Sequence, residues 1–431
     1  MIRALLLAAA IAVSLPCVAQ SMFRGDASHQ GVAPAAPREF HRVKWRFPTG
    51  ARIVSSAVWH QGAVIFGSDD GNVYAVDAAT GRQRWMQRTG GPVASTPAVA
   101  AGKVYALSDD GRVYALDAAN GEVLWKFATG GERRFEARGL HGMQPATQTF
   151  ADMFDVYRSS PAVVDGTVYF GSGDGHVYAV DATAGSLRWK FRTGDVVHAS
   201  PAVHGGMVYV GGWDGRFYAL DARSGEQRWV FQGGVDALMH NQQGFQSSPA
   251  VVDGVVYTGS RDANVYALDA RTGAEKWRFP TGASWVNSSP AVANGRVWFA
   301  TSDSSRIHAV DAASGKPLLQ EDSKAYVFSS PVVAGNVVLV GVLNGTLQAR
   351  DRETGALLWE FRTDAARANE GWVLTAEGRF NSAMLFPSSW YDATALAFDR
   401  QQSVGSFYAT PLVAQGVIYI GSADGNLYAI E

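Results

Sequence analysis

The sequence of 431 residues has 47% hydrophobic, 11% aromatic and 18% charged side chains, with 47 Gly and 1 Cys. This composition is typical of a globular protein and excludes the disordered, collagenous and disulfide-rich classes. The formal net charge of −2 provides no basic field for nucleic acid or for an anionic membrane surface. We therefore expect no nucleic-acid partner.

The first 19 residues have the pattern of a secretory signal peptide. Arg3 precedes an apolar run from Ala4 to Leu15, and Cys17 and Ala19 are small residues at positions −3 and −1 of a cleavage site. The run is shorter than the roughly 20 residues that span a bilayer, and no later stretch is long enough either. We expect cleavage after Ala19 and a periplasmic or secreted protein without a transmembrane segment. An outer-membrane lipoprotein anchored at Cys17 is less favoured, because Pro16 stands where a lipidation signal needs a small residue.

One unit recurs eight times in the rest of the chain. In residues 159–191 it contains Ser-Ser-Pro, four short runs rich in β-branched and aromatic residues, two Asp-Gly turns and a closing Trp189. Asp-Gly dipeptides favour tight hairpins, so each unit predicts four short antiparallel strands. The equivalent turns are Asp70-Gly71, Asp110-Gly111, Asp174-Gly175, Asp214-Gly215, Asp262-Ala263, Asp303-Ser304, Asn344-Gly345 and Asp424-Gly425. The equivalent closing residues are Trp85, Trp125, Trp189, Trp229, Trp277 and Trp359, with Leu318 or Leu319 in the sixth unit.

The eighth unit stops at Glu431, after its third strand. Its missing fourth strand matches residues 43–50, in which Trp45 takes the place of the closing tryptophan. Pairing of these two segments closes a ring and removes the open edges of a linear array. The sequence therefore predicts an all-β fold, an eight-bladed β-propeller of four-stranded blades closed by the N-terminal strand.

The repeat resembles a known family. Residues 75–85, Ala-Val-Asp-Ala-Ala-Thr-Gly-Arg-Gln-Arg-Trp, are similar to the tryptophan-docking motif of the PQQ-like repeat of quinoprotein dehydrogenases and BamB-like outer-membrane assembly lipoproteins. The resemblance covers about residues 41–431 and implies that each closing tryptophan packs between neighbouring blades. Residues 22–31 resemble the N-terminal arm of exported members of this family. The expected organisation is a signal peptide at 1–19, an arm at 20–40 and a propeller at 41–431.

Three of the connections between blades are long. The bare connection takes 12 residues from Trp85 to Pro97, whereas 36 separate Trp125 from Pro161, 20 separate Trp229 from Pro249 and 52 separate Trp359 from Pro411. This places insertions at about 131–157, 233–246 and 364–407. Connections of this kind emerge on one face of a propeller, so we expect the insertions to gather over one mouth of the central channel.

A polar arc is predicted at that mouth. The residue three places before the strand-starting proline is polar in four consecutive blades, where it is Arg158, His198, Gln246 and Asn287. We predict a site there for a small polar or anionic ligand, with Arg158 suited to a carboxylate or phosphate. Trp285 beside the arc and four insertion residues, Arg138, His141, His240 and Asn241, are further candidate ligand-binding residues. The alternative is that these side chains are solvated or cap strand ends.

Two function classes follow. The first is a noncatalytic binding or scaffold protein of the cell envelope, BamB-like in architecture, that holds an unknown protein partner or a small polar ligand. The alternative is a quinoprotein oxidoreductase, for which the resemblance implies PQQ with calcium, a carboxylate base and often a disulfide of adjacent cysteines. The mature chain has no cysteine and the arc has no Asp or Glu, so we assign no catalytic residue and no cofactor. His141, His198 and His240 follow no metal motif, so no metal site is predicted.

Overall fold

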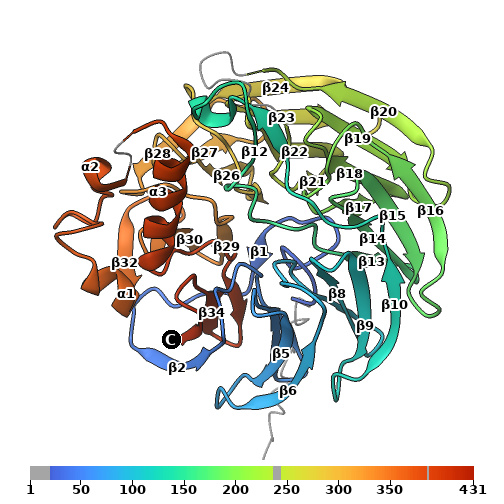
Figure 1. Ribbon diagram of the computed structural model, residues 1–431, viewed down its shortest axis with the longest axis horizontal. Helices are drawn as coiled ribbons and strands as arrows, with labels where there is room; N and C mark the ends of the chain where they lie inside the picture. Colours follow the sequence, from blue (N-terminus) through green and yellow to red (C-terminus); the bar gives the residue numbers. More distant parts are fainter. Residues whose placement is uncertain (1–19, 236–243, 386–387) are drawn as a thin grey trace, which may run out of the picture.

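The computed structural model describes residues 20–235, 244–385 and 388–431. In this part of the chain, eight antiparallel blades surround a central channel (Figure 1). Blades one to four consist of β3 (Val58–His60), β4 (Ala63–Gly67), β5 (Asn72–Asp77), β6 (Gln83–Arg88); β7 (Ala98–Ala100), β8 (Lys103–Ser108), β9 (Arg112–Asp117), β10 (Val123–Ala128); β13 (Ala162–Val164), β14 (Thr167–Gly171), β15 (His176–Asp181), β16 (Leu187–Arg192); β17 (Ala202–His204), β18 (Met207–Gly211), β19 (Arg216–Asp221), β20 (Gln227–Gln232). Blades five to eight consist of β21 (Ala250–Val252), β22 (Val255–Gly259), β23 (Asn264–Asp269), β24 (Glu275–Pro280); β25 (Ala291–Ala293), β26 (Arg296–Ala300), β27 (Arg306–Asp311), β28 (Pro317–Asp322); β29 (Val332–Ala334), β30 (Val337–Val342), β31 (Thr346–Asp351), β32 (Leu357–Arg362); β33 (Leu412–Ala414), β34 (Val417–Gly421), β35 (Asn426–Ile430), β2 (Val43–Pro48).

The Asp-Gly turn inside a blade is held by its own side chain. In blade three the Asp174 carboxylate accepts hydrogen bonds from the backbone amide of His176 at 3.0 Å and from the hydroxyl of Tyr178 at 2.5 Å, while Gly175 adopts a φ of +82°. A positive φ is strained for residues with a Cβ, which explains the glycine. The local sequence thus fixes the hairpin that presents the second and third strands.

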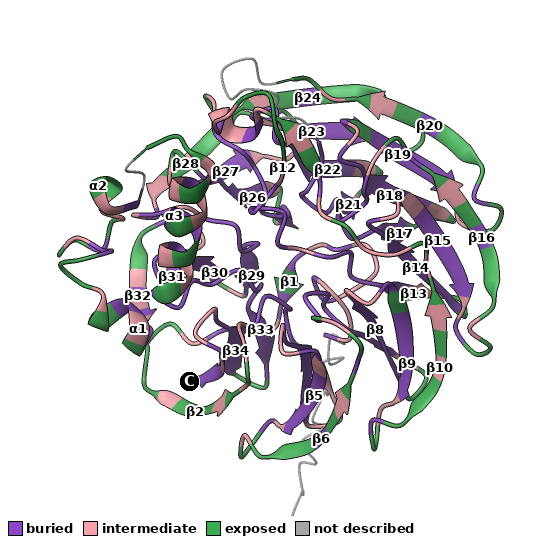
Figure 2. Ribbon diagram, in the orientation of Figure 1, coloured by how far each residue is buried: buried purple, intermediate pink, exposed green. Residues whose placement is uncertain are grey.

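The ring closes as predicted. Strand β2 pairs antiparallel with β35, with Trp45 opposite Ala429 and Phe47 opposite Leu427. The N-terminal strand β2 and the C-terminal strands β33–β35 therefore form one blade, and the eighth sheet has four strands. The middle strands of the blades are buried and the outer strands carry most of the exposed residues (Figure 2).

The closing tryptophans dock on the next blade. Trp189, for example, donates its indole N–H to the carbonyl of Ala222 at 2.9 Å, and its ring packs against Gly225. In blade six, Leu319 pairs with Ala309 just as Trp277 pairs with Ala267 in blade five. Leu319, and not Leu318, therefore takes the place of the tryptophan.

The N-terminal arm crosses the inner edges of the blades. Backbone carbonyls of residues 20–31 accept hydrogen bonds of 2.6–3.0 Å from the second residue of six inner strands, Trp59, Val99, Val203, Val251, Val292 and Val333. The arm then adds the short strand β1 (Val32–Ala33), parallel to β29 of blade seven. The buried guanidinium of Arg24 anchors the arm, because it donates hydrogen bonds to the carbonyls of Pro290 and Pro331. The arm thus ties six blades together at the centre of the ring (Figure 1).

The first and third insertions carry structure of their own. The first contains a two-stranded sheet, β11 (Glu136–Arg138) and β12 (Thr149–Ala151), and the short helix η1 (Leu140–Gly142). The third contains α1 (Asp364–Ala368), α2 (Ser382–Leu385) and α3 (Tyr391–Ser403). They touch, because Phe150 stacks on Tyr391 with centroids 4.7 Å apart. Within the described ranges, no helix is long and apolar enough to cross a membrane.

Candidate functional site

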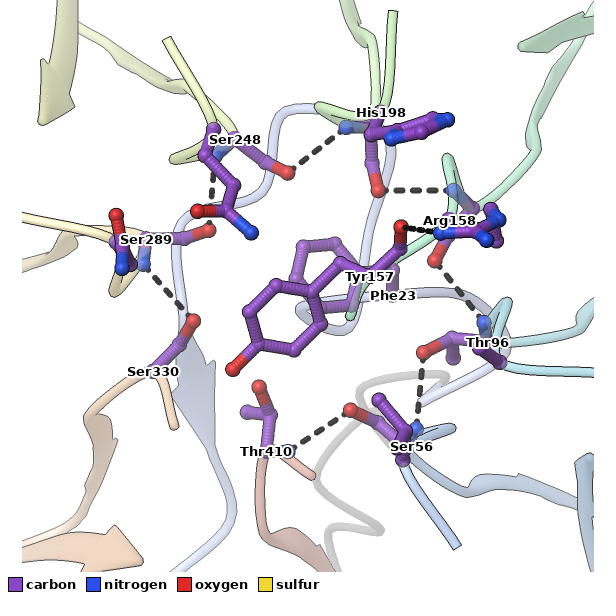
Figure 3. A pocket seen from close by; sticks show the side chains of 16 residues that line it. Phe23, Ser56, Thr96, Tyr157, Arg158, His198, Ser248, Ser289, Ser330 and Thr410 are labelled. Carbon is purple, nitrogen blue, oxygen red and sulfur yellow. Dashed lines mark hydrogen bonds between the residues drawn. The ribbon is translucent and has the colours of Figure 1, made fainter. Parts of the chain in front are cut away.

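The central channel is narrowed by a ring of hydroxyls. Each blade has a Ser or Thr two residues before its innermost strand, followed by Pro or, in blade one, by Ala57. Its hydroxyl accepts a hydrogen bond of 2.8–3.1 Å from the backbone amide of the equivalent residue in the blade before it, at seven of the eight junctions (Figure 3). The rings of Phe23, from the arm, and Tyr157, from the first insertion, lie inside this girdle. The remaining cavity is about 30 Å³, which is room for one or two water molecules.

The four residues of the predicted arc do converge on this channel. Arg158, His198, Gln246 and Asn287 all line it, together with the apolar Val54 and Ala94 of blades one and two. Figure 3 labels Arg158 and His198 at the rim of the channel. They are buried, however, and the side chains of the first three already have protein partners. The binding role of the arc stays a prediction, and a ligand there would have to compete with these contacts.

Carboxylates from the first insertion and from blade two neutralise the charged members of the arc. Arg158 forms an ion pair with Asp109 at 2.9 Å. The Nδ1 of His198 lies 2.7 Å from the carboxylate of Asp155, and its Nε2 lies 3.4 Å from that of Glu132. Burial by itself lowers the pKa of His198, but the Asp155 carboxylate and the hydrogen bonds to it outweigh burial and the repulsion from Arg158, so the net pKa is raised. The surroundings of His198 therefore favour its protonated form more than water does.

A second buried cation, Arg261, lies beside the arc. Its guanidinium is fully buried between the rings of Trp213 and Trp285, 4.3 Å from each centroid. It donates to the Asp152 carboxylate and, at 2.8 and 3.1 Å, to the amide oxygen of Gln246. Although burial disfavours the charged form of Asp152, the charge of Arg261 and its own hydrogen bonds outweigh this and lower its pKa. This cluster is a closed ion-pair network under the first insertion.

An open cavity lies next to that network. It has a volume of about 430 Å³ and is bounded by the first insertion, the third insertion and the loops of blades six and seven. Its lining residues are His141, Phe154, Trp285, Ser302, Asp303, Tyr326, Phe328, Ser388, Ser389, Thr394 and Gln401. This size falls within the roughly 300–1,000 Å³ of small-molecule sites, whereas the channel is far smaller.

The other predicted residues are distributed over the insertion face. Trp285 and His141 line the open cavity, and the imidazole of His141 also meets the Asp152 carboxylate at 2.8 Å. Arg138 lies on the exposed strand β11 and lines neither the channel nor the cavity. His240 and Asn241 lie outside the described residues.

Sequence reasoning missed Asp109, Trp213, Arg261 and Ser302. These residues occupy one position of the repeat, directly before the turn Asp, and they differ from blade to blade while the turn itself hardly changes. Variation at a single position of a regular repeat was the available signal. Asp152, Asp155 and Gln401 lie in insertions that have no repeat to align, so no comparable signal marked them.

The channel does not fit PQQ, the cofactor of the alternative class. The space left inside the ring of hydroxyls by Tyr157 and Phe23 is about 30 Å³. Arg158, which lines this space, is already paired with the carboxylate of Asp109. The three carboxylates of PQQ would there face Asp109, Glu132 and Asp155, which disfavours binding by like-charge repulsion. Among the described residues, no group of three His, Cys, Asp or Glu could hold a metal ion.

The fold and the repeat define a propeller of PQQ-like units, with a narrow central channel and an open cavity between the first and third insertions. The family model described as outer membrane protein assembly factor BamB matches residues 32–155, 143–277 and 237–431. The chain therefore belongs to this family of PQQ-like repeat proteins.

Individual relatives are distant. BamB of Yersinia pestis is 26% identical over 163 residues, which are 33% of this chain and 41% of that protein, so this chain spans less than half of that relative. The crystal structure of BamB from Moraxella catarrhalis has a TM-score of 0.62 at 16% identity and covers 90% of this chain and 97% of its own. Quinohemoprotein alcohol dehydrogenase from Comamonas testosteroni has a TM-score of 0.66 at 15% identity, covering 97% and 81%. Similarity at this level to solved structures establishes the fold alone.

Proposed function

We propose that the protein is a noncatalytic binding protein of the cell envelope, and that its ligand occupies the cavity between the first and third insertions. The observation that carries this proposal is the cavity of about 430 Å³ on the face where both insertions meet. Rigid repeat scaffolds concentrate function in such added loops. The residues of the first 19 positions fit an export signal, and the name of the relatives concerns outer membrane protein assembly. Both support a place outside the cytoplasm.

The quinoprotein alternative has the fold similarity to quinohemoprotein alcohol dehydrogenase in its favour. The filled channel and the carboxylates around Arg158 favour the binding protein instead. The same insertion face could also hold a protein partner, and the relatives' printed role in assembly supports a scaffold of that kind.

A cavity-filling variant tests the proposal. Ser389 lines the cavity and is exposed, so Ser389→Trp fills the space without disturbing a packed core. Thr183→Trp, on an exposed turn of blade three, is the matched control. Small polar compounds are screened by thermal shift and the hits are titrated calorimetrically, with PQQ plus calcium as a separate arm assayed for dye-linked alcohol oxidation.

We expect hits to bind the wild type and Thr183→Trp equally and to bind Ser389→Trp at least tenfold more weakly. Equal binding by Ser389→Trp, an absence of any hit, or alcohol oxidation with PQQ and calcium would each overturn the proposal.

A further inference from the structure

We infer that the cavity between the insertions takes a neutral, polyhydroxylated ring of the saccharide class. This inference rests on the proposed function, because it names the ligand of that same cavity. It follows from three properties of the wall: aromatic surfaces, unpartnered polar groups and the balance of charge.

Aromatic rings form much of the wall. Phe154, Trp285, Tyr326 and Phe328 line the cavity from three different parts of the chain. Trp285 is held in place because Arg261 stacks on it at 4.3 Å and is itself fixed by Asp152. Aromatic faces are electron-rich and attract weakly positive C–H groups. The C–H face of a sugar ring presents such groups, while its hydroxyls point outward to the polar part of a wall.

Three polar atoms at the cavity are buried without a hydrogen-bond partner among the described residues. They are both amide atoms of Gln401, on α3, and the indole nitrogen of Trp285. Gln401 has no exposed surface and Trp285 is 5% exposed. An unpartnered buried polar group costs about 1–3 kcal/mol, so native proteins supply most such groups with a partner from the protein, an ordered water or a ligand. A hydroxyl both donates and accepts, and vicinal hydroxyls can satisfy the oxygen and the nitrogen of one amide together.

The charges around the cavity disfavour ions of either sign. Its lining, as far as the structure describes it, contains the carboxylate of Asp303 but no Lys or Arg, and the imidazole of His141 in the same wall already faces the Asp152 carboxylate at 2.8 Å, so an anion would meet the repulsion of Asp303. A cation stacked on Trp285 would face Arg261 behind the same ring. Asp303 is exposed and accepts a hydrogen bond from Ser302 at 2.6 Å. It retains acceptor capacity for a ligand hydroxyl, because a carboxylate has about four lone-pair sites.

Calorimetric titration with sugars of matched size tests the inference. The probes are the methyl glycosides of glucose, galactose, mannose and N-acetylglucosamine, together with glucosamine as a cation and glucuronate as an anion. Maltose and maltoheptaose form a further arm, which distinguishes a free sugar from the end of a glycan chain. We expect at least one neutral sugar to bind, and the charged probes to bind at least tenfold more weakly.

Two variants locate the binding. Gln401→Leu keeps the volume of the side chain and removes its hydrogen bonds, and Asp303→Asn changes an exposed residue that does not endanger folding. Each is expected to weaken the neutral sugar about tenfold, the effect of one lost hydrogen bond of about 1.4 kcal/mol. Gln87→Leu on β6 and Asp392→Asn on α3, which do not line the cavity, are the matched controls and are expected to bind as the wild type does.

The outcomes separate the two proposals. Preference for a charged probe, with binding lost in Ser389→Trp, overturns the saccharide assignment and leaves the cavity as the binding site. If a neutral sugar binds but neither Gln401→Leu nor Asp303→Asn weakens its binding, the sugar binds elsewhere and the assignment is overturned as well. Failure of every probe, while other compounds bind at the cavity, also refutes the saccharide class alone.

Discussion

The pair formed by Arg261 and Asp152 illustrates how two buried side chains position the wall of the open cavity. Both side chains are fully buried, and the guanidinium also stacks on two tryptophans. A buried charge is tolerated only when it is paired and hydrogen-bonded, because desolvation costs several kcal/mol per ion. The pair therefore fixes the floor beneath the first insertion, and with it the ring of Trp285 in the cavity wall.

Removal of Arg261 alone should destabilise the protein far more than removal of Arg261 and Asp152 together. Arg261→Met removes the guanidinium partner of the buried Asp152 carboxylate, leaves it facing the imidazole of His141, and is expected to lower the free energy of unfolding by about 3–5 kcal/mol. The double variant Arg261→Met with Asp152→Asn is expected to recover part of this loss. Urea denaturation of the wild type, the two single variants and the double variant measures the coupling. An additive cycle would contradict the pairing.

His198 is expected to make stability depend on pH. Its pKa in the folded protein is raised above the ordinary value of 6.5 by Asp155 and Glu132, against the effects of burial and of Arg158. The charged imidazole therefore contributes stability that is fully present below about pH 6.5 and is lost as the pH rises through the higher folded pKa. The unfolding free energy of wild type minus that of His198→Gln should be larger at pH 6.0 than at pH 8.5.

The paired comparison is needed because other histidines act in the opposite direction. Burial lowers the pKa of His29 to about 3 and that of His308 to about 4. Both residues therefore lower the free energy of unfolding of the protein as the pH falls below 6.5. These effects are common to the wild type and His198→Gln and cancel in the difference. A difference that stays constant between the two pH values would show that folding does not shift the pKa of His198, and a smaller difference at pH 6.0 would show that the pKa is lowered.

At the scale of the strand and turn, the docking of tryptophan on glycine sets the contact between blades. A Cβ at Gly225 would lie 2.6 Å from the ring of Trp189, and Gly225 has a φ of +74°. Gly254 has the same φ, but a Cβ there would meet nothing within 4 Å. The two glycines therefore separate the cost of backbone strain from the cost of the lost docking contact.

Gly225→Ala should destabilise the protein more than Gly254→Ala. Both substitutions place a Cβ in the left-handed region, at about 1–2 kcal/mol. Gly225→Ala also displaces Trp189 and strains its hydrogen bond to Ala222, for which we expect a further 1–3 kcal/mol, as for overpacking in a core. Chemical denaturation of the two variants gives the difference, and equal losses would show that the contact between blades tolerates the methyl group.

The blades could be predicted from sequence because their signals are local and repeated. Most units have an Asp-Gly turn and a closing Trp at a fixed distance from it, and the exceptions keep the same spacing, so eight weak patterns reinforce one another. The convergence of Arg158, His198, Gln246 and Asn287 followed from the same register. The carboxylates that pair with His198 could not be predicted, because Glu132 and Asp155 come from an insertion whose fold depends on long-range contacts.

At the scale of the whole molecule, two separate devices hold the ring closed. Strand β2 completes the eighth blade with five paired positions, and Trp45 docks on blade one through a hydrogen bond to Ala78 at 3.1 Å. The arm, in contrast, bonds to six inner strands at the centre of the ring. The sequence predicted the first device through the match of residues 43–50 to other closing strands. The resemblance of residues 22–31 indicated an arm but not these contacts, because apart from the bonds of Arg24 they are made by backbone carbonyls, which leave no pattern of side chains.

Two truncations should separate these devices. A protein lacking residues 20–39 keeps β2 and is expected to melt in one cooperative transition at a lower temperature, since it loses six backbone hydrogen bonds of about 0.5–1.5 kcal/mol each.

A protein lacking residues 20–50 also loses β2, which exposes the edge of β35 and removes the docking of Trp45. It should lose cooperative melting or aggregate, because an open hydrophobic edge is a template for association. Calorimetry and light scattering measure both properties, and a synthetic peptide of residues 39–50 should restore the transition of the longer truncation if β2 is what closes the ring. Unchanged melting after removal of residues 20–50 would show that the ring is stable without its closing strand.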